Sequence, residues 1–85
     1  EGLDSMNNVH SLSELRQGEK GAIYGINENS TIGMKMSEMG ASPGCMITVE
    51  NTEDTSGGMD IKVKGYHLRL SKEDAELITV VHLGI

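Results

Sequence analysis

The side chains that could hold a metal ion are few and widely spaced in this sequence. Besides the carboxylates, they are His10, Cys45, His67 and His82. No two of them have a spacing such as C-x-x-C or H-x-x-x-H, which places two ligands on one turn or one helix face. We expect Cys45 to be a small buried residue, His67 to point outward and His82 to lie on a frayed C-terminal strand. These residues are therefore weak candidates for a metal site.

The methionines offer a second chemistry, because a cluster of thioether sulfurs favours Cu(I). Met34, Met36, Met39, Met46 and Met59 could form such a cluster. Packing explains most of them better, since Met36 and Met39 have the spacing of one buried helix face and the chain has no Phe or Trp to fill its core. Met34 falls off that face, and we expect it to be exposed.

Residue patterns typical of catalysis give no support for an enzyme. A phosphate-binding loop of the form G-x-x-x-x-G-K-[ST] or G-x-G-x-x-G is absent from the sequence. We expect no serine nucleophile on a positioned elbow. The neighbouring carboxylates Glu73 and Asp74 come at an expected helix N-terminus, where the helix dipole accounts for acidic residues. The sequence therefore predicts a protein without catalytic activity.

One short helix is expected to lead directly into a strand. Ser30 is a suitable N-cap for a helix over residues 31–39, whose inward side we expect to be Ile32, Met36 and Met39. Gly40 follows where a left-handed residue ends a helix. Pro43-Gly44 then fits the centre of a type II turn, and alternation through residues 47–50 predicts a strand.

Residues 59–70 predict a β-hairpin with a two-residue turn at Lys64-Gly65, because the alternation of apolar residues shifts by one at the glycine. The pairs expected on the inner face are Val63 with Tyr66, Ile61 with Leu68 and Met59 with Leu70. On the outer face, Asp60 should oppose Arg69 as a favourable charge pair.

Further elements complete an all-β pattern. A strand is expected over residues 20–26, with a bulge at Gly25, and a last strand over 77–82. Ser11 with Glu14, and Ser71 with Asp74, resemble capping boxes that open helical turns, the first running to about Arg16. About five short strands, a helical insertion and one or two helical turns predict a small barrel, closed or nearly closed.

Length and charge limit the alternatives. The 85 residues suffice for one small domain, expected over residues 9–85, and residues 1–8 are expected to be disordered. Residues 1–5 precede Met6 and are expected to be a remnant of cloning. The net charge of −6 argues against a nucleic-acid partner, because such binding depends on basic side chains. The single cysteine, with no signal peptide or long apolar segment, predicts a soluble protein of a reducing compartment that does not insert into a membrane.

Several short motifs, in order, resemble the FeoA-type accessory proteins of bacterial ferrous iron transport. The resemblance runs from about Leu12 to Val81. The motifs are Leu12-Ser13-Glu14-Leu15, Gly18-Glu19-Lys20-Gly21, Ile23-x-Gly25-Ile26, Met39-Gly40-x-x-Pro43-Gly44, Ile47-x-Val49, Gly65-Tyr66-x-Leu68-x-Leu70 and the segment from Glu73 to Val80. This resemblance implies an SH3-like β-barrel, a fold also found at the C-terminus of DtxR-type metal-dependent repressors.

The resemblance also implies a function. It points to a non-enzymatic, cytoplasmic interaction module that binds the cytoplasmic GTPase region of a ferrous iron permease and so lies at the inner face of the cell membrane. The alternative is a domain that senses or carries a transition metal, as in the repressors. No cofactor is required, although surface histidines can take up Fe(II), or zinc adventitiously. The sequence leaves open whether the chain forms an oligomer.

An exposed surface is the expected site for a protein partner. From the residues alone, we predict that it combines Tyr24, the outer side of the helix at Met34 and Lys35, and the turn at Pro43 and Gly44. A flexible methionine beside an aromatic ring and a charge can adapt to a partner surface.

Overall fold

The computed structural model describes residues 9–27 and 29–82 of the chain. Its elements are β1 (Val9–Ser11), the 3-10 turn η1 (Leu12–Glu14), β2 (Lys20–Ile26), α2 (Thr31–Glu38), β3 (Met46–Thr52), β4 (Met59–Val63), β5 (Tyr66–Leu70), α3 (Lys72–Glu76) and β6 (Ile78–His82). The expectation of disorder over residues 1–8 falls outside these described residues.

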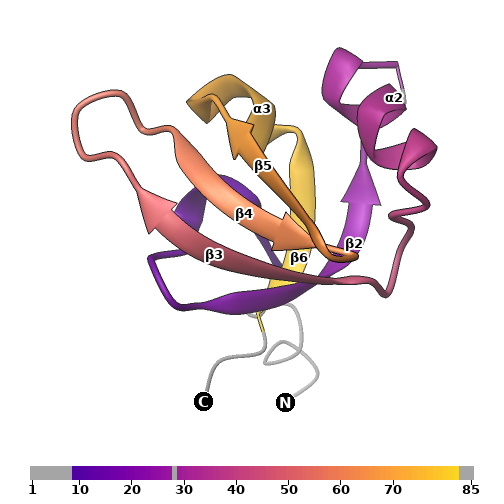
Figure 1. The fold of residues 1–85 in the computed structure, drawn as a ribbon, viewed down its shortest axis with the longest axis horizontal. Helices are drawn as coiled ribbons and strands as arrows, with labels where there is room; N and C mark the ends of the chain where they lie inside the picture. Colours follow the sequence, from indigo (N-terminus) through magenta and orange to yellow (C-terminus); the bar gives the residue numbers. More distant parts are fainter. Residues whose placement is uncertain (1–8, 28, 83–85) are drawn as a thin grey trace.

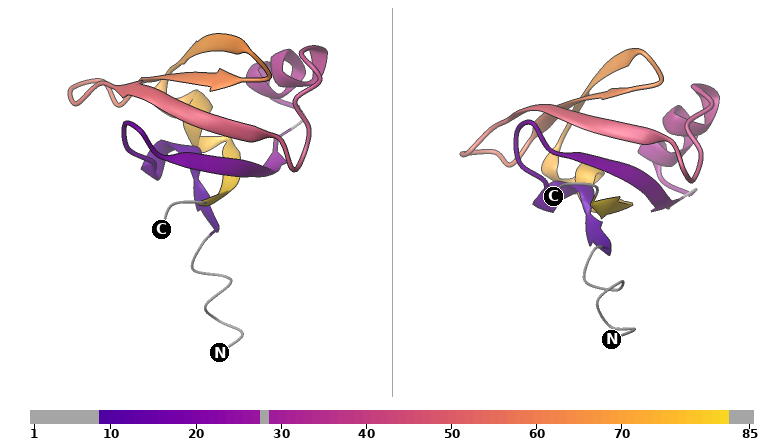
Figure 2. Two further views of the ribbon diagram at one scale, coloured as in Figure 1. Left: turned by 60° about the horizontal axis from the view of Figure 1, so that its bottom comes forward. Right: turned by 90° about the horizontal axis from the view of Figure 1, so that it is seen from below.

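Six antiparallel strands make up the sheet of the described residues, in the order β1-β6-β2-β3-β4-β5 (Figure 1). The sheet curls strongly around one core, as the turned views show (Figure 2). The turn η1 and helix α3 contact each other, and α3 also contacts β5 and β6. The predicted all-β, SH3-like barrel with a short helical insertion is therefore confirmed. None of the helices in this part of the chain is long and apolar enough to cross a bilayer.

The core is aliphatic, as a chain without Phe or Trp requires. The buried apolar side chains are Leu12, Leu15, Ile23, Ile32, Met36, Ala41, Ile47, Val49, Met59, Ile61, Val63, Leu70, Ala75, Ile78 and Val80. Met36 and Met59 are completely enclosed, whereas Met39 is half-buried against the core. Met34 is exposed as expected, but Met46 is exposed too, so the packing interpretation fails for Met46.

The predicted register of the hairpin is confirmed in every pair, but Tyr66 is 54% exposed, so its expected place on the inner face was wrong. β4 and β5 pair from Met59 with Leu70 through to Val63 with Tyr66. Lys64 and Gly65 both have positive φ, at 53° and 82°, as a two-residue turn of this twist requires. Arg69 Nη1 lies 3.2 Å from Asp60 Oδ1, and Arg69 Nη2 lies 3.0 Å from Glu53 Oε2. The raised pKa of Arg69 follows from the hydrogen bonds it donates, first to Glu53 and then to Asp60.

The helix and turn that lead into β3 also form as predicted. Ser30 Oγ accepts a hydrogen bond from the Gly33 amide at 3.0 Å, which caps α2. Gly40 has a φ of 79° and ends the helix. In the turn that follows, Gly44 has a φ of 98°, and the Cys45 amide donates to the Ser42 carbonyl at 3.0 Å. This backbone positions α2 beside the end of β2.

Three local expectations were wrong. Ser11 caps only a single 3-10 turn through the Ser13 amide, while Glu14 pairs with His10 instead of returning to the cap. β1 was not predicted, because its three residues gain stability only by pairing with β6, far along the chain. His82 does not lie on a frayed strand, since it pairs with Gly21 in the sheet.

Candidate partner-binding groove

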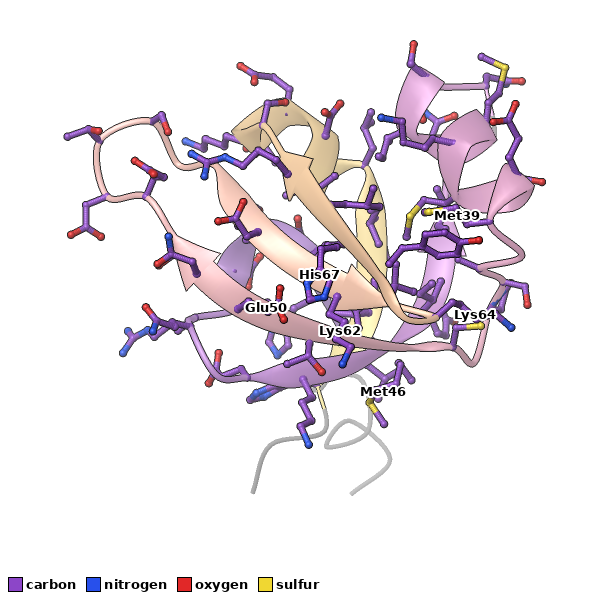
Figure 3. All side chains as sticks on the ribbon, in the orientation of Figure 1. Met39, Met46, Glu50, Lys62, Lys64 and His67 are labelled. Carbon is purple, nitrogen blue, oxygen red and sulfur yellow. The ribbon has the colours of Figure 1, made fainter. Side chains whose placement is uncertain are left out.

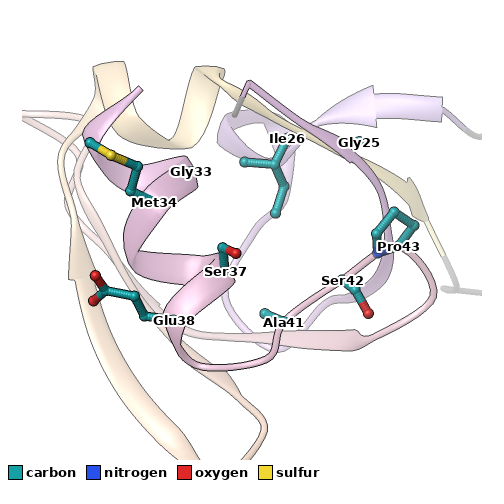
Figure 4. Close-up of a pocket in the computed structure, with 9 residues that line it drawn as sticks. All are labelled: Gly25, Ile26, Gly33, Met34, Ser37, Glu38, Ala41, Ser42 and Pro43. Carbon is teal, nitrogen blue, oxygen red and sulfur yellow. The ribbon is translucent and has the colours of Figure 1, made fainter. Parts of the chain in front are cut away.

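A groove of about 640 Å³ lies between helix α2 and the chain that leaves it on one side and the end of β2 on the other (Figure 4). The residues that line it are Gly25, Ile26, Gly33, Met34, Ser37, Glu38, Ala41, Ser42 and Pro43. They come from two segments, residues 25–26 and residues 33–43, which the fold brings together. This volume suits one or two apolar side chains of a partner.

Glycine lines this groove at two positions. A Cβ placed on Gly25 would have no heavy atom within 4 Å, so a side chain there would extend into free space. Gly25 also lies where the pairing of β2 with β6 shifts by one, as the predicted bulge requires. Gly33 is buried within α2 and lines the opposite wall. A larger residue at position 25 would place its side chain in open space at the groove wall.

The walls are held by the core and by backbone hydrogen bonds. Ile32 and Met36 anchor α2 in the core. The Gly44 amide donates to the Ile23 carbonyl at 2.7 Å, and the Ile23 amide donates to the Cys45 carbonyl at 2.8 Å, which ties the turn to β2. Because both walls are fixed in this way, the groove is formed before any partner arrives.

The lining is apolar with a polar border. Ile26, Ala41, Met34 and Pro43 supply apolar surface, and Met34 is 55% exposed. Ser37 and Ser42 add hydroxyl groups, and Glu38 is the one charged side chain in the lining. Apolar surface with few polar groups is typical of sites that accept a side chain or a short peptide segment.

The structure brings only part of the predicted partner surface to this groove. Met34 and Pro43 line it. Tyr24 is 63% exposed beside Gly25, but it does not line the groove, and neither do Lys35 on α2 and Gly44 in the turn.

Sequence reasoning missed the other lining residues. Two of them, Gly25 and Gly33, carried a signal, because glycine inside a strand or a helix often marks a close approach or an open space. The predicted bulge at Gly25 used that signal without connecting it to a binding site. Ser37 and Glu38 follow Gly33 and Met34 by four residues each on the same side of the helix, so the helical repeat alone would have grouped them, whereas Ala41 lies beyond the helix end.

Residues 40–44 read Gly-Ala-Ser-Pro-Gly and match the letters of the G-x-S-x-G nucleophile motif. The structural context is the reverse of that motif, which leads from a strand into a helix, since these residues leave α2 and enter β3. No histidine in the described part of the chain is hydrogen-bonded to the Ser42 hydroxyl, which instead lies 4.0 Å from the Cys45 sulfur. Ser42 therefore has no activating base.

Cys45 does not line the groove and is half-buried, so the expectation of a buried cysteine was wrong. Its Sγ accepts a hydrogen bond from the Ser42 amide at 3.4 Å. This hydrogen bond is the main reason that the pKa of the Cys45 thiol is lowered, and the charge of Lys64 adds to the effect. The thiol at this position therefore loses its proton more readily than an ordinary cysteine does.

Two of the three histidines, His10 and His82, lie close together. His10 Nδ1 lies 3.1 Å from Glu14 Oε1, and His82 Nε2 lies 3.4 Å from Glu19 Oε2. The two imidazole rings meet edge to face with their centroids 6.2 Å apart. His82 Nε2 is buried without a hydrogen-bond partner among the described residues.

The remaining candidates lie elsewhere. His67 points outward as predicted, and its Nδ1 lies 2.8 Å from Glu50 Oε1 on the outer face of the sheet (Figure 3). Within residues 9–27 and 29–82, no three His, Cys, Asp or Glu side chains are grouped so that they could hold a metal ion.

Solved structures of similar fold include both iron transport proteins and repressors. A crystal structure of an iron uptake regulatory protein, FeoA, is 29% identical, with a TM-score of 0.75, and covers 88% of this chain and 99% of that one. FeoA of Stenotrophomonas maltophilia complexed with zinc, described as a prokaryotic SH3 domain protein, is 19% identical, with a TM-score of 0.71 and coverage of 84% and 88%. A manganese-dependent transcriptional repressor is 20% identical, with a TM-score of 0.77, over 88% of this chain and 41% of the repressor.

Among curated proteins, none matches this sequence. The model of the FeoA domain family matches residues 10–82, which include every helix and nearly every strand residue described above. The motifs that suggested this resemblance all fall within that match. The chain therefore belongs to the FeoA domain family.

Proposed function

We propose that this protein is a cytoplasmic accessory module of ferrous iron uptake that binds the cytoplasmic GTPase region of a ferrous iron permease and catalyses no reaction. Membership of the FeoA family supports the link to iron uptake. The zinc-complexed relative from Stenotrophomonas maltophilia is described as a candidate activating factor of ferrous iron transport, in keeping with an accessory role. Through its partner, the protein would lie at the inner face of the cell membrane.

The observation that carries this proposal is the preformed groove beside α2. Met34 and Pro43 expose apolar surface along it, and Met34 can adjust its flexible side chain to a partner. A segment that inserts one aliphatic or aromatic side chain would gain about 1.5–3 kcal/mol from its burial. The gain is enough to make one side chain a dominant contact of a small, reversible interface.

The experiment is a calorimetric titration of the isolated cytoplasmic region of the permease with the full chain. Met34→Ala should weaken binding about tenfold, because it removes the exposed apolar side chain at the border of the groove. Met46→Ala is the matched control, since Met46 is also an exposed methionine and lies on β3 outside the groove. Equal affinities for the two variants would contradict the placement of the interface, and no binding by the parent protein would contradict the partner.

A second candidate function is that of a domain that senses or carries a transition metal. The observation in its favour is the buried His82 Nε2, which has no hydrogen-bond partner among the described residues and lies 3.4 Å from a carboxylate oxygen of Glu19. The manganese-dependent repressor of similar fold is consistent with it. An anaerobic titration with Fe(II) separates the two candidates, because a sensor should bind one equivalent and an interaction module should not.

A further inference from the structure

Glu38 gives the groove a single negative charge at its border. It follows Met34 by one helical turn, and the two side chains extend to the same side of α2 (Figure 4). Among the described residues, Glu38 forms no ion pair, whereas the carboxylates of Glu14, Glu19, Glu50 and Glu53 all lie beside a basic side chain. The carboxylate is therefore available to an outside cation.

The position of Glu38 at the end of α2 adds to the negative potential around its carboxylate. It is the last residue of α2, where the helix dipole places negative partial charge. Lys35 is the basic residue of that last turn, but it does not line the groove. Lys64 passes close to Gly40 just beyond the helix end without forming an ion pair with Glu38 among the described contacts. The negative charge of Glu38 should therefore attract a cation to the border of the groove.

We propose that the groove selects a protein segment in which an apolar side chain stands next to Arg or Lys. The apolar side chain would cover Ile26 and Pro43, and the cation would reach the Glu38 carboxylate. Arg fits best, because its guanidinium can donate two parallel hydrogen bonds to a carboxylate. An acidic segment or an anionic membrane surface would be repelled by the same charge. This inference rests on the proposed function, in which the groove is the partner site, and it adds the chemistry of the segment.

Two short synthetic peptides test the proposal without the permease. One carries arginine–leucine–arginine and the other glutamate–leucine–glutamate between blocked glycines. Titration into isotope-labelled protein should shift the amide signals of Gly25, Gly33 and Glu38 with the basic peptide and leave them unchanged with the acidic one. Equal shifts with both peptides, or shifts with neither, would overturn the proposal.

Variants of the carboxylate supply the matched comparison. Glu38→Gln keeps the size of the side chain and should weaken binding of the basic peptide about three- to tenfold, and Glu38→Lys should abolish it. Glu76→Gln is the control, because Glu76 is also an exposed residue that ends a helix, but it lies in α3 away from the groove. Raising the salt concentration should weaken binding by the parent and leave Glu38→Gln almost unaffected.

The two proposals fail in different ways. If Met34→Ala weakens binding of the permease region but Glu38→Gln and Glu38→Lys leave it unchanged, the groove is the partner site and the charge selection is wrong. If the basic peptide binds in the groove but the permease region does not bind the protein at all, the partner is wrong and the chemistry of the groove stands.

Discussion

Gly25 in β2 and Gly33 in α2 line the same groove from opposite walls (Figure 4). Neither has a side chain to fill the space, and the walls that carry them are fixed by the core on one side and by the sheet on the other. The groove therefore has a small residue in each wall of a rigid frame. Binding at such a site can be altered while the fold is left intact, which makes the account open to direct tests.

The hairpin turn gives the first prediction. Gly65→Val places a β-branched residue at a φ of 82°, a conformation that costs on the order of 1–3 kcal/mol for such a side chain. A domain of this size has little stability to lose, so its thermal unfolding midpoint should fall by several degrees. Gly25→Val is the control, since Gly25 has no positive φ and a Cβ there meets no neighbour. Identical melting curves for Gly65→Val and the parent would refute this reading of the turn.

Truncation of the two methionines in α2 should have very different effects on the free energy of unfolding. Met36 is completely enclosed, so Met36→Ala should lower the free energy of unfolding by about 2–5 kcal/mol, whereas Met36→Leu should cost less than about 1.5 kcal/mol. Met34→Ala should change stability by no more than about 0.5 kcal/mol, because Met34 is exposed. Urea denaturation measures all three. A large loss of stability for Met34→Ala would mean that Met34 is part of the core and not a docking residue.

These outcomes reflect what sequence patterns can and cannot predict. The hairpin was predictable because alternation over residues 59–70 allows one register that keeps both faces consistent. The helix was predictable from a cap at Ser30 and a stop at Gly40, both set by local chemistry. β1 and the groove were not predictable, because each depends on which distant segments become neighbours. A pattern of residues does not state that Gly25 and Gly33 will share a cavity.

Cys45 should be more reactive than an ordinary cysteine. The hydrogen bond from Ser42 lowers the pKa of its thiol, so a larger fraction is thiolate near neutral pH. Alkylation by iodoacetamide at neutral pH should be faster in the native protein than in the urea-unfolded protein.

The same lowered pKa links Cys45 to stability. Because the folded-state pKa lies below the unfolded one, the contribution to stability is present above the unfolded pKa and is lost as pH falls through the folded pKa. Cys45→Ser should remove this alkaline part of the pH dependence. For the alkylation test, a slower reaction of the native protein than of the unfolded protein would contradict a thiol pKa lowered by the hydrogen bond from Ser42.

Metal binding should be weak and not stoichiometric under the favoured account. No three potential ligands of the described residues are grouped to hold an ion, so an anaerobic titration with Fe(II) should show no saturation at one equivalent. Zinc should behave in the same way, and His82→Gln should leave both titrations unchanged. Stoichiometric binding that His82→Gln removes would instead support the metal-sensing candidate.

The central claim is that the groove between α2 and the end of β2 binds the permease. Its most direct test is a titration of the permease's cytoplasmic GTPase region with the parent protein and with Gly25→Val, which places a side chain at the groove wall without straining the backbone. We expect the parent to bind and Gly25→Val to bind at least tenfold more weakly, about 1.4 kcal/mol, with an unchanged melting temperature. Equal affinity of a folded Gly25→Val variant would contradict the claim.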